Sequence, residues 1–171
     1  LSRPLIKNGD RIGIASWTGT AFEYFMPSLF MPTVRGSLLY EALRFAFRAG
    51  RERTAVLPDS KRVWGISESG FYAFDEQNNY GYQAFGVPAL GYKRGLEKDL
   101  VISPYSSFLT LTLNLSLPLA NLEKLKKYGA YGKYGFYEAV DFTPSRSTEG
   151  KGSVVKSSMA HHVGMSILAA A

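Results

Sequence analysis

Segments of helical length, separated by long stretches rich in glycine and aromatic residues, constrain the fold of this chain most. From Gly36 to Gly50 apolar residues recur near a period of 3.6, which predicts a helix that ends near Gly50. The segment Ser103–Ser116 begins with Ser103-Pro104, and Leu117–Tyr128 follows the cap residue Ser116 and has an early proline; both are signals of helix starts. The segment Ser157–Ala171 predicts a last helix. We therefore expect an all-α fold whose functional site lies in the intervening loops.

The sequence of two segments does not predict one type of secondary structure clearly. Thr and Leu alternate within Ser103–Ser116, which is also typical of a strand, but the Ser-Pro start favours a helix. The segment Ser69–Lys93 contains glycine too often for a regular helix or strand, yet it also carries seven aromatic residues. We expect it to form a structured loop that faces a ligand.

Composition narrows the class of protein. The 171 residues, 46% hydrophobic, suffice for one globular domain spanning residues 1–171, and no apolar run reaches the roughly 20 residues that cross a bilayer. Without cysteine, disulfides and thiolate metal sites are excluded. The net charge of +6 is scattered along the chain, so we expect no nucleic-acid partner. No phosphate loop or dinucleotide fingerprint is present, and we expect no cofactor. The start at Leu1 and the apolar end suggest a piece of a larger protein.

Two carboxylates stand among aromatic residues and glycines, which is typical of sites that bind sugars. Glu68 follows Trp64, and Glu138 follows Tyr134. Apolar surroundings raise the pKa of a carboxyl group and fit it for general-acid work, while aromatic faces suit the C–H faces of a sugar ring. The alternative for Glu68 is a loop carboxylate that caps a turn. Glu138 and Asp141 would share one face if their segment is helical, which favours a joint role. The alternative for Glu138 is an acid in the first turn of a helix, where it stabilises the helix dipole.

Other candidate site residues also fit either a functional or a structural role. Glu23 interrupts a nearly continuous apolar run, so it needs a partner or a role. Asp75 fits a loop salt bridge as well as a sugar contact, and the amide and phenol groups at 78–82 fit either sugar hydroxyls or a polar turn. His161 and His162 are adjacent in the predicted last helix, where side chains leave about 100° apart, so we expect no metal site. Either histidine could bind a sugar hydroxyl or be a buried, hydrogen-bonded residue.

Six ordered blocks together resemble the glycoamylase-like domain of cyclic β-1,2-glucan synthases, which is related to endo-β-1,2-glucanases. The blocks are 16–27, 64–69, 79–86, 134–139, 142–146 and 159–165. The resemblance implies part of an (α/α)6 toroid, a glycoside hydrolase or transglycosylase whose glucan donor is closed into a ring, and a parent protein that is membrane-associated on the cytoplasmic side of the bacterial inner membrane. The implied catalytic acids are Glu138, Glu68 and Glu23. The implied substrate-binding residues are Trp64, Asp75, Asn79, Tyr80, Tyr82, Tyr137, Asp141, Arg146, His161 and His162.

A second hypothesis comes from a different class of protein. The same residues could form a glucan-binding or scaffold domain without catalysis, in which the acids only accept hydrogen bonds from sugar hydroxyls. The two hypotheses differ in whether a β-glucan is cleaved or only bound.

Overall fold

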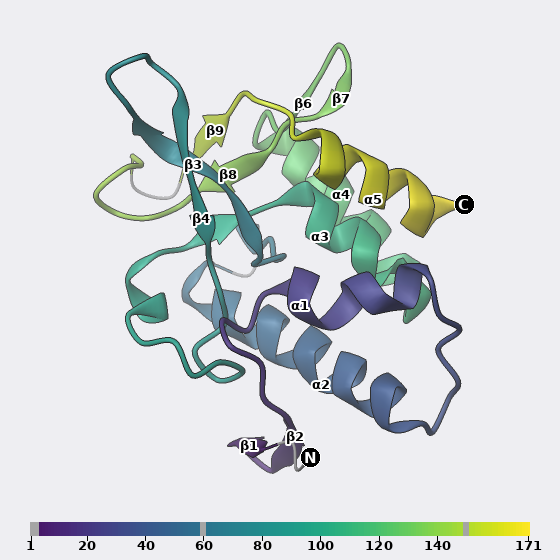
Figure 1. Ribbon diagram of the computed structural model, residues 1–171. Helices are drawn as coiled ribbons and strands as arrows, with labels where there is room; N and C mark the ends of the chain where they lie inside the picture. The colour runs from purple at the N-terminus through teal and green to yellow at the C-terminus, as the bar shows by residue number, and fades with distance from the viewer. Residues whose placement is uncertain (1–3, 59–60, 149–150) are drawn as a thin grey trace.

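The computed structural model describes residues 4–58, 61–148 and 151–171, and it combines helices with several small antiparallel sheets (Figure 1). The α-helices in these residues are α1 Ala21–Phe25, α2 Leu38–Arg53, α3 Pro104–Leu109, α4 Ser116–Lys127 and α5 Ala160–Ala170. The 3-10 turns are η1 Met26–Leu29, η2 Thr54–Val56, η4 Leu96–Lys98 and η5 Thr110–Thr112. None of the helices described is long and apolar enough to cross a membrane.

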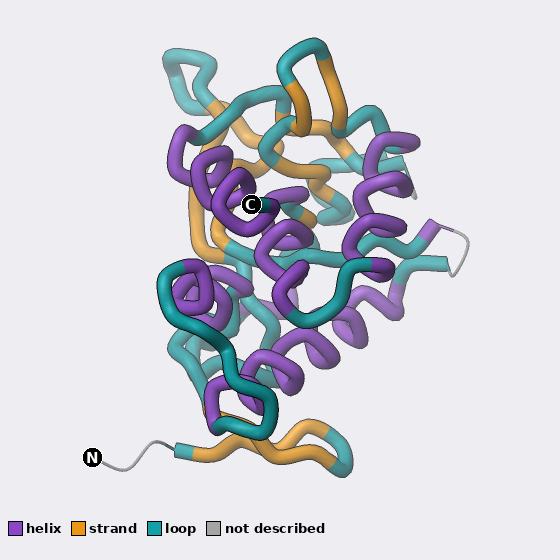
Figure 2. The backbone as a smooth tube through the Cα atoms, turned by 90° about the vertical axis from the view of Figure 1, so that its right-hand side faces the viewer, coloured by secondary structure: helices purple, strands orange, loops and turns teal. Residues whose placement is uncertain are grey.

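Nine short strands pair in four antiparallel groups within the described residues (Figure 2). The first group is the hairpin of β1 Leu5–Asn8 and β2 Arg11–Ile14. The second is the hairpin of β3 Glu68–Phe74 and β4 Tyr80–Ala84, with an irregularity between Phe71 and Phe74. The third has the order β5-β8-β9, formed by β5 Val101–Ile102, β8 Ala139–Asp141 and β9 Ser153–Val155. The fourth is the hairpin of β6 Tyr131–Gly132 and β7 Gly135–Phe136.

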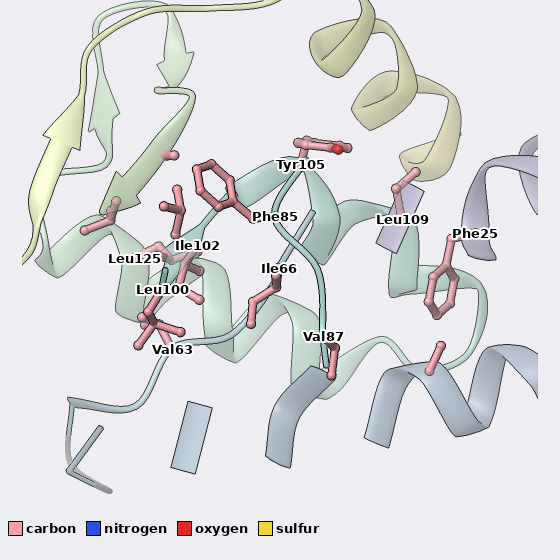
Figure 3. Packing of buried hydrophobic residues seen from close by; sticks show 14 of the residues in the cluster. Phe25, Val63, Ile66, Phe85, Val87, Leu100, Ile102, Tyr105, Leu109 and Leu125 are labelled. Atoms are coloured by element: carbon pink, nitrogen blue, oxygen red, sulfur yellow. The ribbon is translucent and has the colours of Figure 1, made fainter. Parts of the chain in front are cut away.

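The longest helix follows from local sequence signals. Ser37 caps α2 by accepting a hydrogen bond from the backbone N–H of Tyr40, and the helix buries an apolar face that includes Leu43 and Phe45. Arg51 and Arg53 lie in its last turn, where cations stabilise the helix dipole. Apolar side chains from this face, from β5 and from the segments leading into and out of the β3–β4 hairpin form one core, part of which is shown in Figure 3.

The expected all-α class is wrong, because 39% of the described residues are helical and 21% are in strands. The main error concerns Ser69–Lys93, which contains the β3–β4 hairpin instead of a loop. Its glycines do not break the strands: Gly81 leaves space for the ring of Phe71, and a Cβ on Gly70 would lie 3.2 Å from Glu138 Cγ. The absence of a side chain therefore allows neighbouring groups to approach these strands closely.

The predicted helices are largely confirmed, with shifted ends. The helix expected over Gly36–Gly50 continues to Arg53, since glycine is tolerated inside a helix that tertiary packing stabilises. The segment Ser103–Ser116 is helical only as far as Leu109, after which η5 follows. The helix α4 is as expected, and Gly129 follows it with a φ of 81°. The last helix begins at Ala160, three residues later than expected.

Candidate functional site

Acid and histidine side chains from the β3–β4 hairpin and from the start of α5 converge on one site. Glu68 is the first residue of β3, and His161 and His162 lie in the first turn of α5. One carboxylate oxygen of Glu68 and one ring nitrogen of each histidine lie within 4.8 Å of one another. Glu68 is half-buried and His161 is exposed, so the cluster is open to solvent on one side. We call these three residues the Glu68–histidine cluster.

Tyr82 of β4 joins the two histidines. Its hydroxyl lies 3.3 Å from Nε2 of His161 and 3.4 Å from Nε2 of His162. The two imidazole centres are 4.0 Å apart. The expectation that adjacent histidines in a helix diverge is therefore wrong here, because the 100° rule describes where the side chains leave the helix. The rotatable side-chain bonds bring both rings back to the same phenol.

Glu138 holds His162 from the interior. Oε1 of Glu138 lies 2.8 Å from Nδ1 of His162 and accepts a hydrogen bond of 3.1 Å from the backbone N–H of Gly70. Both side chains are only 2% exposed. With Glu138 ionised, Nδ1 carries the proton and donates to the carboxylate, which leaves Nε2 directed towards the Glu68–histidine cluster.

A buried tyrosine fixes the plane of the same imidazole. The ring of Tyr105, in α3, stacks on His162 with centroids 3.7 Å apart and planes only 9° apart. Its hydroxyl oxygen lies 2.7 Å from Ser67 Oγ and 3.0 Å from the carbonyl oxygen of Glu68, and its single proton can be donated to either. Sequence reasoning missed Tyr105 because nothing in the helix start Ser103-Pro104 distinguishes this aromatic from a core residue. It links the helical core directly to the first residue of β3.

The two phenols of the site stay protonated. Burial raises the pKa of Tyr82, and the negative charges of Glu68 and Glu138 and a hydrogen bond with Glu68 raise it further. Burial likewise raises the pKa of Tyr105 well above its usual range. At neutral pH both hydroxyls are therefore neutral groups that can donate hydrogen bonds.

His162 lies between the two acids that the sequence singled out. The contacts of the His162 ring with both acids limit the distance between the nearest oxygens of Glu68 and Glu138 to no more than about 10 Å. The carboxyl spacings of both retaining and inverting glycosidases fall within this limit. Glu68 faces the open side of the cluster, while Glu138 lies behind the imidazole. The structure therefore brings together Glu68, Glu138, Tyr82, His161 and His162.

Asp141 and Arg146 form a separate, internal network. The Asp141 side chain is fully buried, and its Oδ2 lies 2.6 Å from Nε of Arg146. Asp141 also accepts hydrogen bonds from the backbone N–H groups of Tyr72 and Thr143, and Arg146 forms a second ion pair of 2.7 Å with Asp99. These contacts join β8 to β3 and to the segment after η4. The charged groups of Asp141 and Arg146 are therefore both paired with other groups of the protein.

Glu23 is engaged by the backbone around it. Its carboxylate accepts hydrogen bonds from the N–H groups of Thr18, Gly19 and Thr20, and together with Thr20 it forms a capping box at the start of α1. Burial alone would raise the pKa of Glu23, but hydrogen bonds from Ser16, Thr18 and Thr20 lower it overall. This arrangement stabilises the ionised form, which is the opposite of what a proton donor requires.

The remaining candidates lie in the β3–β4 turn or pack internally. Asp75 accepts from the backbone and side-chain N–H groups of Asn79 and is exposed at this turn. The ring of Tyr80 lies 4.7 Å from that of Phe74.

Trp64 is buried, packs edge-on against Phe47 and is tied through its backbone to Asn121. Tyr137 is half-buried, and its hydroxyl fills the space beside Gly132. Trp64 and Tyr137 thus both contact other residues of the protein.

Comparisons with known proteins give consistent results. A family model described as "Putative glucoamylase" matches residues 6–171. The chain is 43% identical, over 172 aligned residues and its whole length, to the cyclic β-(1,2)-glucan synthase NdvB of Rhizobium meliloti, of which it spans only 6%.

Two solved structures share the fold. An endo-β-1,2-glucanase from Chitinophaga pinensis, in complex with sophorotriose and glucose, is 15% identical with a TM-score of 0.56, and the match covers 98% of this chain and 39% of the other. A "putative glucoamylase" from Bacteroides uniformis is 18% identical with a TM-score of 0.54, covering 88% and 34% respectively. At these identities the two structures support the fold alone.

Proposed function

The chain belongs to the glycoamylase family, and from this premise we propose that the Glu68–histidine cluster binds a β-1,2-linked glucan and takes part in cleaving or transferring its glycosidic bonds. The observation that carries the proposal is the continuous array in which Glu68 and Glu138 flank His162, with the Tyr82 phenol beside both histidines. The 43% identity to a cyclic β-(1,2)-glucan synthase supports the choice of linkage.

The two acid–base groups in this proposal are Glu68 and the Glu138–His162 pair. Bond cleavage needs one group that protonates the leaving oxygen and another that assists the attacking water or sugar hydroxyl. Glu68 is accessible from outside and can contact the sugar directly. Glu138, expected from the sequence to be an acid/base itself, would act through His162, because it fixes which imidazole nitrogen is free.

Neutral donors complete the proposed subsite. Tyr82 is 41% exposed, and its raised pKa keeps the hydroxyl available to donate to a sugar oxygen. His161 is exposed beside it and offers a second polar group. These donors orient the sugar relative to Glu68, and orientation of this kind lowers the barrier by holding the reacting atoms in place.

The direct test measures bond cleavage in linear β-1,2-glucan by the full natural polypeptide, wild type against Glu68→Gln and Glu138→Gln. Each change removes a proton-transfer group, or the group that positions it, while keeping the shape, so kcat should fall at least about a hundredfold. Glu76→Gln, at an exposed acid in the turn of the same hairpin, is the matched control and should leave kcat unchanged. Unaltered turnover in both test variants would show the assignment to be wrong.

Product masses and binding separate the remaining possibilities. Hydrolysis adds one water for each bond cut, whereas ring closure by transfer releases a shorter oligosaccharide and consumes no water. Wild-type protein that binds β-1,2-glucan in calorimetry without forming any new product would favour the glucan-binding function instead. Membrane association and location of the parent protein stay predictions from the sequence.

A further inference from the structure

We propose that Glu68, His161 and His162 form a binding site for a divalent cation of the zinc type. Two imidazoles and one carboxylate, with their ligand atoms within 4.8 Å of one another, are the donor set that zinc uses in sites with an open coordination position. Magnesium and calcium prefer oxygen ligands, so the two ring nitrogens favour a borderline metal over these ions.

The ligand atoms lie within 4.8 Å of one another, so tetrahedral coordination requires them to move closer together. With Zn–N and Zn–O distances near 2.0–2.1 Å, ligand atoms around zinc are separated by roughly 3.3 Å. The Tyr82 hydroxyl lies 3.3 Å and 3.4 Å from the two Nε2 atoms, so both nitrogens are directed towards the same group. Three protein ligands would leave a fourth position for a water or a sugar hydroxyl. Because the side chain of His161 is exposed, its ring can rotate to bring its nitrogen closer to the other two ligand atoms, at little cost in packing.

His162 is already oriented as a metal ligand. In metal sites a ligating imidazole usually donates its other N–H to a carboxylate, which fixes the tautomer and makes the free nitrogen more basic. Glu138 accepts from Nδ1 at 2.8 Å, and the stacked ring of Tyr105 holds the imidazole plane. The Nε2 lone pair is therefore prepared before any metal arrives, and the ordering cost on binding is small.

Within these 171 residues, few other side chains can bind a borderline metal. The 171 residues contain two histidines and no cysteine, so these imidazoles are the only soft or borderline ligands that the chain has besides its methionines. Zinc binding that depends on either histidine must therefore involve the Glu68–histidine cluster.

Zinc and glucan would compete, and this consequence alone rests on the proposed function. A bound cation occupies the Glu68 carboxylate and the free imidazole nitrogens, which are the groups assigned to the sugar. Zinc should therefore act as a competitive inhibitor, raising the apparent KM for β-1,2-glucan without changing kcat.

Isothermal titration calorimetry of the full natural polypeptide with zinc chloride, in the absence of glucan, tests the site by itself. His161→Gln, His162→Gln and Glu68→Gln each remove a ligand, and each should weaken zinc binding at least about tenfold, since even the loss of an outer-shell partner costs roughly 10–100-fold. Glu138→Gln leaves all three ligands in place and should weaken binding about tenfold. Glu76→Gln is the control and should bind zinc like the wild type.

The outcomes separate the two proposals. Equal zinc affinity in wild type and both histidine variants, or no zinc binding by wild type, would overturn the metal site even if glucan is cleaved. Histidine-dependent zinc binding supports the site even if no glucan activity is found. Because a His162 variant could fold poorly, the exposed His161→Gln variant, with its melting temperature compared with wild type, carries the decision.

Discussion

Asp141 offers the sharpest test of whether a residue selected from the sequence is structural or binds substrate. Its side chain is fully buried, lies 2.6 Å from Arg146 Nε and accepts hydrogen bonds from the N–H groups of Tyr72 and Thr143. Breaking a buried ion pair from one side typically costs 3–5 kcal/mol. Arg146 keeps a second partner in Asp99 and is 17% exposed, so the expected cost lies near the lower end of that range.

The perturbation is Asp141→Asn, which keeps the size of the side chain, removes its charge and turns one acceptor into an amide donor. That donor would face a backbone N–H, and a buried polar group without a partner costs a further 1–3 kcal/mol. The two costs together predict a loss of about 4–6 kcal/mol in the free energy of unfolding, a large share of the 5–15 kcal/mol typical of a domain. Variant protein that still folds should bind glucan with wild-type affinity.

Urea denaturation followed by tryptophan fluorescence measures this loss, because buried Trp64 becomes exposed on unfolding. Glu123→Gln is the control, since it removes an exposed ion pair with Lys126 and should unfold at the wild-type urea concentration. A loss below about 1 kcal/mol for Asp141→Asn, or a fall in glucan affinity without a loss of stability, would refute the structural role.

Three further predictions concern the capping acid Glu23 and two glycines. Because the folded-state pKa of Glu23 is lowered, its stabilisation is present above the ordinary value of 4.5 and is lost as pH falls through the lowered value. The melting-temperature difference between wild type and Glu23→Gln should therefore shrink below pH 4.5, and a difference unchanged from pH 7 to pH 3 would contradict this. Gly50→Ala, inside α2 with no atom within 4 Å of the new Cβ, should raise the unfolding free energy by about 0.5–1 kcal/mol in urea titrations. Gly86→Ala, whose Cβ would clash with the Thr18 carbonyl, should instead prevent accumulation of folded protein, and soluble protein of wild-type stability would contradict it.

Helices were predictable from this sequence because their signals are local. The apolar period of Leu38–Arg53 and the proline near the start of α4 can be read within one element. The strands of the β3–β4 hairpin could not be read in the same way. Gly70 and Gly81 lie inside them because of contacts with Glu138 and Phe71, one of which is distant in the sequence. A glycine that is required by packing has the same sequence signature as a glycine in a loop.

The residues of the candidate site were likewise predictable only where the signal was local. Glu68 and Glu138 could be selected because each carboxylate lies in aromatic surroundings, which is a local property. The sequence did not show that Glu138 reaches the cluster through His162, since that contact joins the residue before β8 to the first turn of α5. Asp141 looked like Glu138 in the sequence, but it pairs with Arg146 inside the protein. Only the pairing partner, set by the fold, distinguishes the two acids.

The proposed glucan and zinc functions make the same demand on His162. Each requires Nε2 to be free on the open side, and therefore requires the proton to stay on Nδ1. Three independent elements maintain that state: Glu138 before β8 accepts the proton's hydrogen bond, Tyr105 in α3 stacks on the ring, and Tyr82 in β4 stays neutral beside Nε2. Because these elements also contribute to one hydrophobic core, the orientation of the imidazole depends on folding of the whole unit and not on α5 alone.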